Sequence, residues 1–67
     1  MKMKSVTINK EILGGTPVFT GTRVPVQSLF DYLEGSKTID EFLKSFPTVK
    51  KVQVMDVLHN AGQLIAK

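Results

Sequence analysis

The chain has 67 residues, a formal net charge of +3 and no cysteine. A chain of this length forms one domain, and so small a domain buries only about 60% of the surface that its unfolded chain exposes. Disulfides are excluded, and a single histidine leaves a structural zinc site without its usual ligands. We therefore expect a second copy of the chain or another protein to supply further stability.

The mild positive charge permits nucleic-acid binding without requiring it. The first residues, Met1 to Lys4, lead into alternating polar and apolar residues rather than into an apolar run. We therefore expect no signal peptide, no transmembrane span and a cytoplasmic location.

Two short strands around a turn rich in glycine and proline are the first elements expected. Residues 5–9 alternate polar and apolar side chains, which predicts a short, half-buried strand. Repeated glycine and proline in residues 12–26 is typical of a compact β-turn element rather than of a linker. Residues 17–19 are expected to form a second strand and residues 20–22 a turn. Arg23-Val24 then either pairs back against that strand or leads into the next helix.

Three helices are expected to follow, over residues 26–34, residues 39 to 45 or 46, and residues 50–65. In the first two helices apolar side chains recur at helical spacing and form one stripe each. Pro25 suits the beginning of the first helix, and Gly35 suits the C′ position that ends it.

The second helix carries its own beginning and end signals. Thr38 and Glu41 have the spacing of a capping box, and Pro47 ends the helix because the residue before proline disfavours the helical conformation. The predicted fold class is mainly α with a small N-terminal β-ribbon, a three-helix domain of helix-turn-helix or winged-helix-like type. Residues 1–25 form its arm and β-turn element, and residues 26–67 form its three-helix core.

The third helix has more apolar residues than one buried face requires. A core needs a single stripe, so the surplus predicts a second apolar contact, with a partner chain. The apolar residues of this helix are Val52, Val54, Met55, Val57, Leu58, Ala61, Leu64 and Ile65.

Enzyme chemistry has little support in this sequence. Asp40 and Glu41 are explained by capping and by the helix dipole, and the single histidine, His59, falls inside a helix as a surface or interface residue. Gly14-Gly15 is interpreted as a tight turn, because no Lys-Ser/Thr follows it to complete a phosphate-binding loop. We expect no catalytic residue, metal, cofactor or small-molecule substrate.

A DNA-binding surface is the stronger hypothesis. A recognition helix contacts bases from its N-terminal part, which here offers Lys50, Lys51 and Gln53. Asn60 continues this face towards its C-terminal end, whereas Asp56 on the same face would repel phosphate. An ordinary solvated helix face explains the same residues, and that alternative stays open.

Arg23 is the single arginine of the chain. Its planar guanidinium group could hold a phosphate, as part of the DNA-binding set, or a partner carboxylate. We slightly favour an internal tie, to backbone carbonyls or to a carboxylate such as Asp31.

A partner or dimer interface is expected to use apolar residues of the first strand and the third helix. Short exposed strands often pair across subunits, so we expect the N-terminal strand to make a cross-dimer β contact. The residues assigned to this interface are Val6, Ile8, Val52 and Met55.

The stretch from Ile12 to Val26 reads Ile-Leu-Gly-Gly-Thr-Pro-Val-Phe-Thr-Gly-Thr-Arg-Val-Pro-Val. A helix ending in glycine follows it, and then Phe-Leu-Lys-Ser-Phe-Pro. This pattern resembles the domain of unknown function 433 family from about Asn9 to Leu58. The family contains small bacterial and archaeal proteins with a winged-helix-like fold. The matching motif positions look structural first, and they are Gly14, Gly15, Pro17, Gly21, Thr22, Arg23 and Pro25.

The resemblance implies a function in a type II toxin–antitoxin module. Members of the family are often encoded beside a PIN-like nuclease and are regarded as antitoxins, similar in role to VapB-type antitoxins. The implied protein is a homodimer that binds and inhibits a PIN-like RNase toxin and represses its own operon by binding operator DNA. The alternative is a protein-interaction module, or a stand-alone small regulator, that does not bind DNA.

Overall fold

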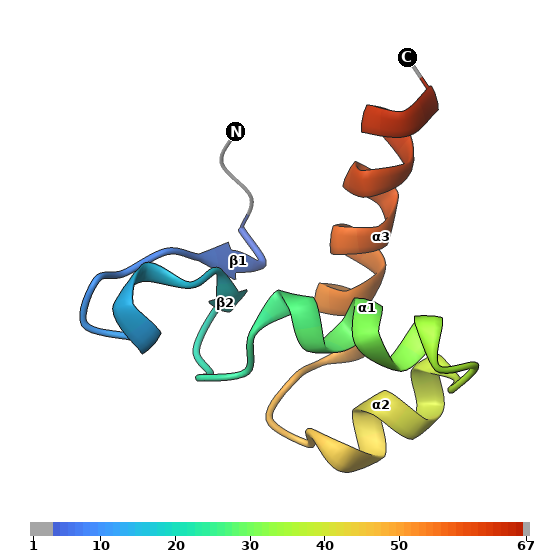
Figure 1. Ribbon diagram of the computed structural model, residues 1–67, viewed down its shortest axis with the longest axis horizontal. Coiled ribbons are helices and arrows are strands. Elements are labelled where there is room, and N and C mark those ends of the chain that lie inside the picture. Colours follow the sequence, from blue (N-terminus) through green and yellow to red (C-terminus); the bar gives the residue numbers. More distant parts are fainter. Residues whose placement is uncertain (1–3, 67) are drawn as a thin grey trace.

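The computed structural model describes residues 4–66, with side chains placed as far as Gly62. It contains a two-stranded sheet, a short 3-10 turn and three helices (Figure 1). The elements are β1 (Val6–Thr7), η1 (Leu13–Gly15), β2 (Val18–Phe19), α1 (Val26–Glu34), α2 (Ile39–Ser45) and α3 (Lys51–Ala66). The predicted fold class, mainly α with a small N-terminal β-ribbon, is confirmed.

The two strands pair within the chain. β1 and β2 are antiparallel, with Val6 opposite Phe19 and Thr7 opposite Val18. The expectation that the N-terminal strand pairs across a dimer is therefore wrong for this edge of β1, because β2 of the same chain occupies it.

The segment after the turn runs back along β2, as one of the two expected arrangements requires. The Phe19 backbone N–H donates to the Val24 carbonyl at 3.0 Å, and Pro25 forms a bridge with Val18. Pro25 is also the N-cap residue of α1. Gly21, with φ of 81°, lies in the turn that the Thr22 N–H closes by donating to the Phe19 carbonyl.

One apolar core joins the sheet to the helices. Phe19 of β2, Leu29 of α1, Phe42 of α2 and Val54 of α3 are fully buried. The Phe19 and Phe42 rings lie 5.9 Å apart between centroids. The N-terminal part is thus more than an arm, since β2 supplies a central core side chain.

The helix termini follow the expected chemistry at one end and depart from it at another. At the beginning of α2, Glu41 N–H donates to Thr38 Oγ1 at 3.1 Å and Thr38 N–H donates to Glu41 Oε1 at 2.9 Å. The predicted capping box is confirmed. α2 ends at Ser45, with Phe46 as its C-cap residue ahead of Pro47.

Gly35 was expected at the left-handed position that ends α1, and this was wrong. Gly35 has φ of −84°, whereas Ser36 has φ of 65°. The Ser36 N–H donates to the Leu33 carbonyl and the Lys37 N–H to the Tyr32 carbonyl, which is the bond pattern of a Schellman motif. α1 ends at Glu34 as expected, but Gly35 is its C-cap residue, so Ser36 takes the C′ position.

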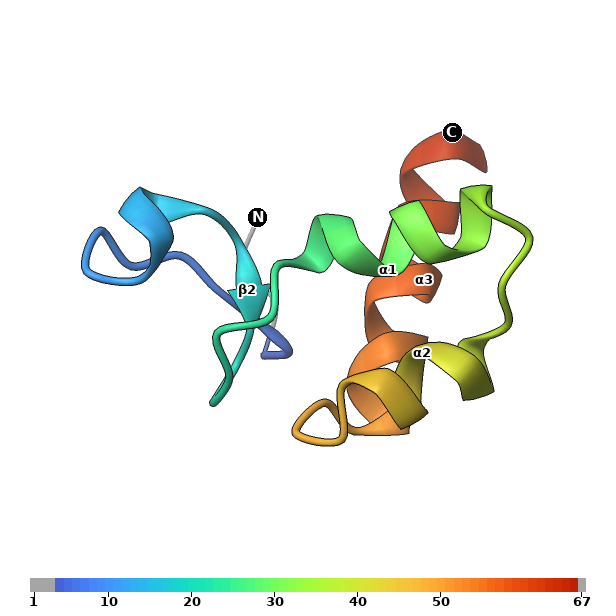
Figure 2. The same cartoon turned by 60° about the horizontal axis from the view of Figure 1, so that its bottom comes forward.

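Figure 2 shows the sheet and η1 at one end of the molecule and the three helices at the other. α1 packs on α2. α2 and α3 follow each other across residues 46–50, in the order that a helix-turn-helix requires. None of the helices in residues 4–66 is long and apolar enough to cross a bilayer.

Candidate functional site

The predicted DNA-contacting residues at the beginning of α3 do not all face outward. Gln53 Oε1 accepts from the Lys50 N–H at 2.9 Å, and Gln53 Nε2 donates to the Thr20 carbonyl at 2.9 Å. The side chain thus caps the helix and ties it to the turn after β2. Both amide atoms are engaged within the chain, which weighs against base contacts by Gln53. That role stays a prediction.

Lys50 and Lys51 remain available. Both are exposed, and neither ammonium group has a hydrogen bond or ion pair with the residues that the structure describes. They stand at the beginning of the last helix, where a recognition helix would meet DNA. Their role as DNA contacts stays a prediction.

Two large apolar side chains cover the outward face of α3. Val52 is 70% exposed and Met55 is 48% exposed, whereas Val54 and Val57 of the same helix are buried. Val52 and Met55 are three residues apart and therefore neighbours on one face. At these two positions the helix exposes apolar side chains, as the surplus of apolar residues in the sequence predicts. We call Val52 and Met55 the outward face of α3.

Further along α3, Asn60 and Asp56 are hydrogen-bonded to each other. Asn60 Nδ2 donates to the Asp56 carbonyl at 2.8 Å and to Asp56 Oδ1 at 3.1 Å. Both residues are partly buried. Asn60 was expected to continue the DNA-binding face, and Asp56 was expected to repel phosphate. Their mutual bonds make them poor candidates for contacts with DNA.

The two interface candidates near the N-terminal strand, Val6 and Ile8, differ in their exposure. Val6 is half-buried, packs against the core and lies opposite Phe19, so it offers less surface to a partner, and its assignment to an interface stays a prediction. Ile8 is 69% exposed directly after β1 and stays a candidate.

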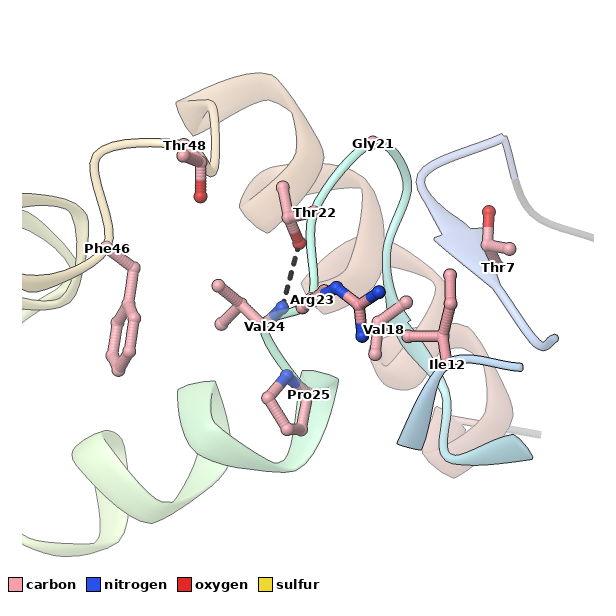
Figure 3. A pocket seen from close by; sticks show the side chains of 10 residues that line it. All are labelled: Thr7, Ile12, Val18, Gly21, Thr22, Arg23, Val24, Pro25, Phe46 and Thr48. Carbon is pink, nitrogen blue, oxygen red and sulfur yellow. Dashed lines mark hydrogen bonds between the residues drawn. The ribbon is translucent and has the colours of Figure 1, made fainter. Parts of the chain in front are cut away.

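An open groove of about 680 Å³ lies between the segment after β2 and the connection from α2 to α3 (Figure 3). Its apolar walls include Ile12, Val24, Pro25 and Phe46, and Thr48 lies at the α2–α3 connection. Arg23 contributes the charged group of the groove.

The internal tie expected for Arg23 is absent. Arg23 is exposed, and its side chain has no hydrogen bond or ion pair with the side chains described up to Gly62 or with the described backbone. Asp31, the suggested acceptor, instead receives a hydrogen bond from Gln27 Nε2 at 3.1 Å. In Figure 3 the guanidinium group of Arg23 lies towards Val18 and Ile12.

The remaining titratable candidates have structural surroundings. The hydrogen bond from the Thr38 backbone N–H lowers the pKa of Glu41, and the Thr38 side chain and the charge of Lys37 act in the same direction. Gly14 and Gly15 adopt φ of 68° and 98° in η1, as the tight-turn interpretation requires. No group of three acidic or histidine side chains in the described part of the chain could hold a metal ion.

Two features were missed in the sequence. Leu13 adopts φ of 51° and is 50% exposed, an unusual backbone conformation for a leucine. The capping role of Gln53 had a signal, because glutamine is favoured three residues after an N-cap position. No sequence signal indicated the hydrogen bond from Gln53 to the Thr20 carbonyl, because the two residues are 33 positions apart.

The fold defines a small, mainly helical domain with an N-terminal two-stranded sheet and an exposed terminal helix. The chain belongs to the family described as Protein of unknown function (DUF433), whose model matches residues 6–61. It is also similar to the protein named Uncharacterized protein y4eO of Sinorhizobium fredii, with 33% identity over 61 residues. That similarity covers 88% of this chain and 28% of the relative, so the chain spans less than a third of the relative's length. No solved structure matches the chain.

Proposed function

We propose that this chain is the antitoxin of a type II toxin–antitoxin module, a homodimer that binds and inhibits a PIN-like RNase. The outward face of α3 is the observation that carries the proposal. Val52 and Met55 expose large apolar side chains on an element whose opposite side packs into the core. Exposed apolar patches on small domains mark protein contacts. The resemblance described above supplies the identity of the partner.

Binding to the toxin is tested with one residue of this face. Met55→Asp places a charge in the apolar contact and should weaken the complex with the co-expressed nuclease about tenfold or more. Because Met55 is 48% exposed, the free energy of unfolding should change by less than about 0.5 kcal/mol. Isothermal titration calorimetry and urea unfolding measure the two quantities. Unchanged affinity would contradict this use of the face.

A second activity, autorepression of the operon, is favoured by Lys50 and Lys51. Their exposed ammonium groups at the beginning of α3 suit phosphate contacts. Val52 and Met55 could add apolar contacts to thymine methyl groups. With Gln53 engaged inside the chain, the surface offers little hydrogen-bonding readout of bases, so shape and phosphate contacts would dominate.

DNA binding is tested by charge reversal of the basic pair. The double variant Lys50→Glu/Lys51→Glu should lose affinity for the upstream operator fragment in a gel-shift assay at low salt. Wild-type affinity should fall steeply as salt rises, because bound counterions are released. Affinity that survives the double substitution would remove DNA binding from the proposal and favour the protein-interaction alternative.

A further inference from the structure

The backbone around Arg23 is fixed on both sides while its side chain is left free. Thr22 Oγ1 donates to the Phe19 carbonyl at 2.8 Å and accepts from the Val24 N–H at 3.0 Å. The Val24 carbonyl in turn accepts from the Phe19 N–H, and Pro25 is bridged to Val18. The arginine therefore projects from a held segment, which lowers the ordering cost of binding.

The lining of the groove around this arginine contains no carboxylate that could neutralise its charge. None of its lining residues is acidic, and the Arg23 side chain has no hydrogen-bonding or ionic partner among the groups that the structure describes. The walls on either side are apolar, from Ile12 and Val24 to Pro25 and Phe46. The groove thus complements a single negative charge flanked by apolar groups.

Nucleic acid fits this groove less well than a peptide does. A nucleic-acid backbone is a continuous row of charges and is usually met by several cations on an open surface. The groove offers one cation, and the basic pair Lys50 and Lys51 is not among its lining residues. A planar guanidinium group beside apolar walls instead matches a carboxylate next to a bulky apolar side chain.

We propose that this groove is a peptide-binding site, in which Arg23 pairs with an aspartate or glutamate of a partner protein and the apolar walls receive the neighbouring side chain. The site is separate from the outward face of α3, and it does not depend on the antitoxin function. It takes Arg23 out of the DNA-binding set.

The test is an NMR titration of the isotopically labelled chain. The probe is a pool of short peptides, capped at both ends, with one fixed glutamate among alanine, serine, leucine and phenylalanine. A matched pool carries glutamine in place of the glutamate. We expect the glutamate pool to shift the signals of Arg23, Val24 and Thr48, and the glutamine pool to bind about tenfold more weakly.

Substitutions at the groove complete the test. Arg23→Gln should abolish the preference for the glutamate pool, and Arg23→Lys should restore it only in part, because lysine keeps the charge without the planar fork. Met55→Asp, on the other surface, should leave peptide binding unchanged. Equal binding of the two pools, no shifts with either pool, or shifts of the Arg23 side chain by short duplex DNA instead would each overturn the proposal.

Discussion

Ser36 ends α1 in the left-handed conformation, with φ of 65°, directly after a glycine that does not use its own freedom there. A residue with a β-carbon is strained in this region by about 1 kcal/mol relative to glycine. A β-carbon on Gly35 would meet the Asp31 carbonyl oxygen at 3.4 Å, an ordinary contact distance. The sequence pattern predicts the left-handed position at Gly35, but in the structure Ser36 occupies it.

Ser36→Gly should stabilise the protein by about 0.5 to 1 kcal/mol, because glycine relieves the strain at the C′ position. Gly35→Ala is the matched control and should leave stability unchanged or slightly raised, since its φ of −84° suits alanine. Urea unfolding of both variants measures the effect. If Gly35→Ala lowers the free energy of unfolding by more than about 1 kcal/mol, Gly35 rather than Ser36 adopts the left-handed conformation.

Glu41 should make the stability depend on pH in the acid range. Its pKa in the folded chain lies below the ordinary value of 4.5, chiefly through the hydrogen bond from the Thr38 N–H. The stabilisation is therefore complete above that ordinary value and is lost as the pH falls through the lowered pKa. Thermal melts should show that the wild type loses more stability on acidification than Glu41→Gln, which keeps an acceptor oxygen but cannot titrate. Parallel curves for the two proteins would contradict this.

The helices were predictable from local signals. Apolar spacing, Pro25 and the Thr38–Glu41 pair placed α1 and α2 at their observed residues, because these signals act within a few residues of each helix end. The sheet was less predictable, since the choice of β2 as partner of β1 depends on tertiary packing around Phe19.

The candidate site was predictable only in part. The exposed apolar residues of α3 followed from their number, because one face of a helix cannot bury them all. The inward turn of Gln53 and the free side chain of Arg23 could not be predicted, because both depend on which distant groups the fold brings near. Gln53 meets the carbonyl of Thr20, whereas Asp31 is engaged by Gln27.

At the scale of elements, Gln53 should affect folding rather than DNA sequence preference. Gln53→Ala removes the cap on the Lys50 N–H and the tie to Thr20, and should destabilise the protein by about 1 to 2 kcal/mol in urea unfolding. Gln53→Glu keeps an acceptor for the Lys50 N–H but loses the donor to the Thr20 carbonyl. Its stability should therefore lie between those of the wild type and Gln53→Ala. If the alanine variant is as stable as the wild type and changes operator preference, Gln53 contacts bases after all.

At the scale of the whole molecule, three surfaces lie on one small core. In the proposed function, the outward face of α3 makes the apolar contact with the toxin, and Lys50 and Lys51 supply the charge that would meet DNA. The groove around Arg23 is separate from both. A chain of this size gains stability from a partner that covers exposed apolar side chains. Binding of the toxin is thus expected to raise the melting temperature of the complex.

The central claim is that this chain neutralises a toxin through the outward face of α3. The most direct measurement is growth of cells that express the neighbouring open reading frame from an inducible promoter, with and without this protein. We expect growth arrest that the wild type and Lys50→Glu/Lys51→Glu relieve, and that Met55→Asp does not relieve at equal protein level. No arrest, or arrest that the wild-type chain does not relieve, would contradict the antitoxin function.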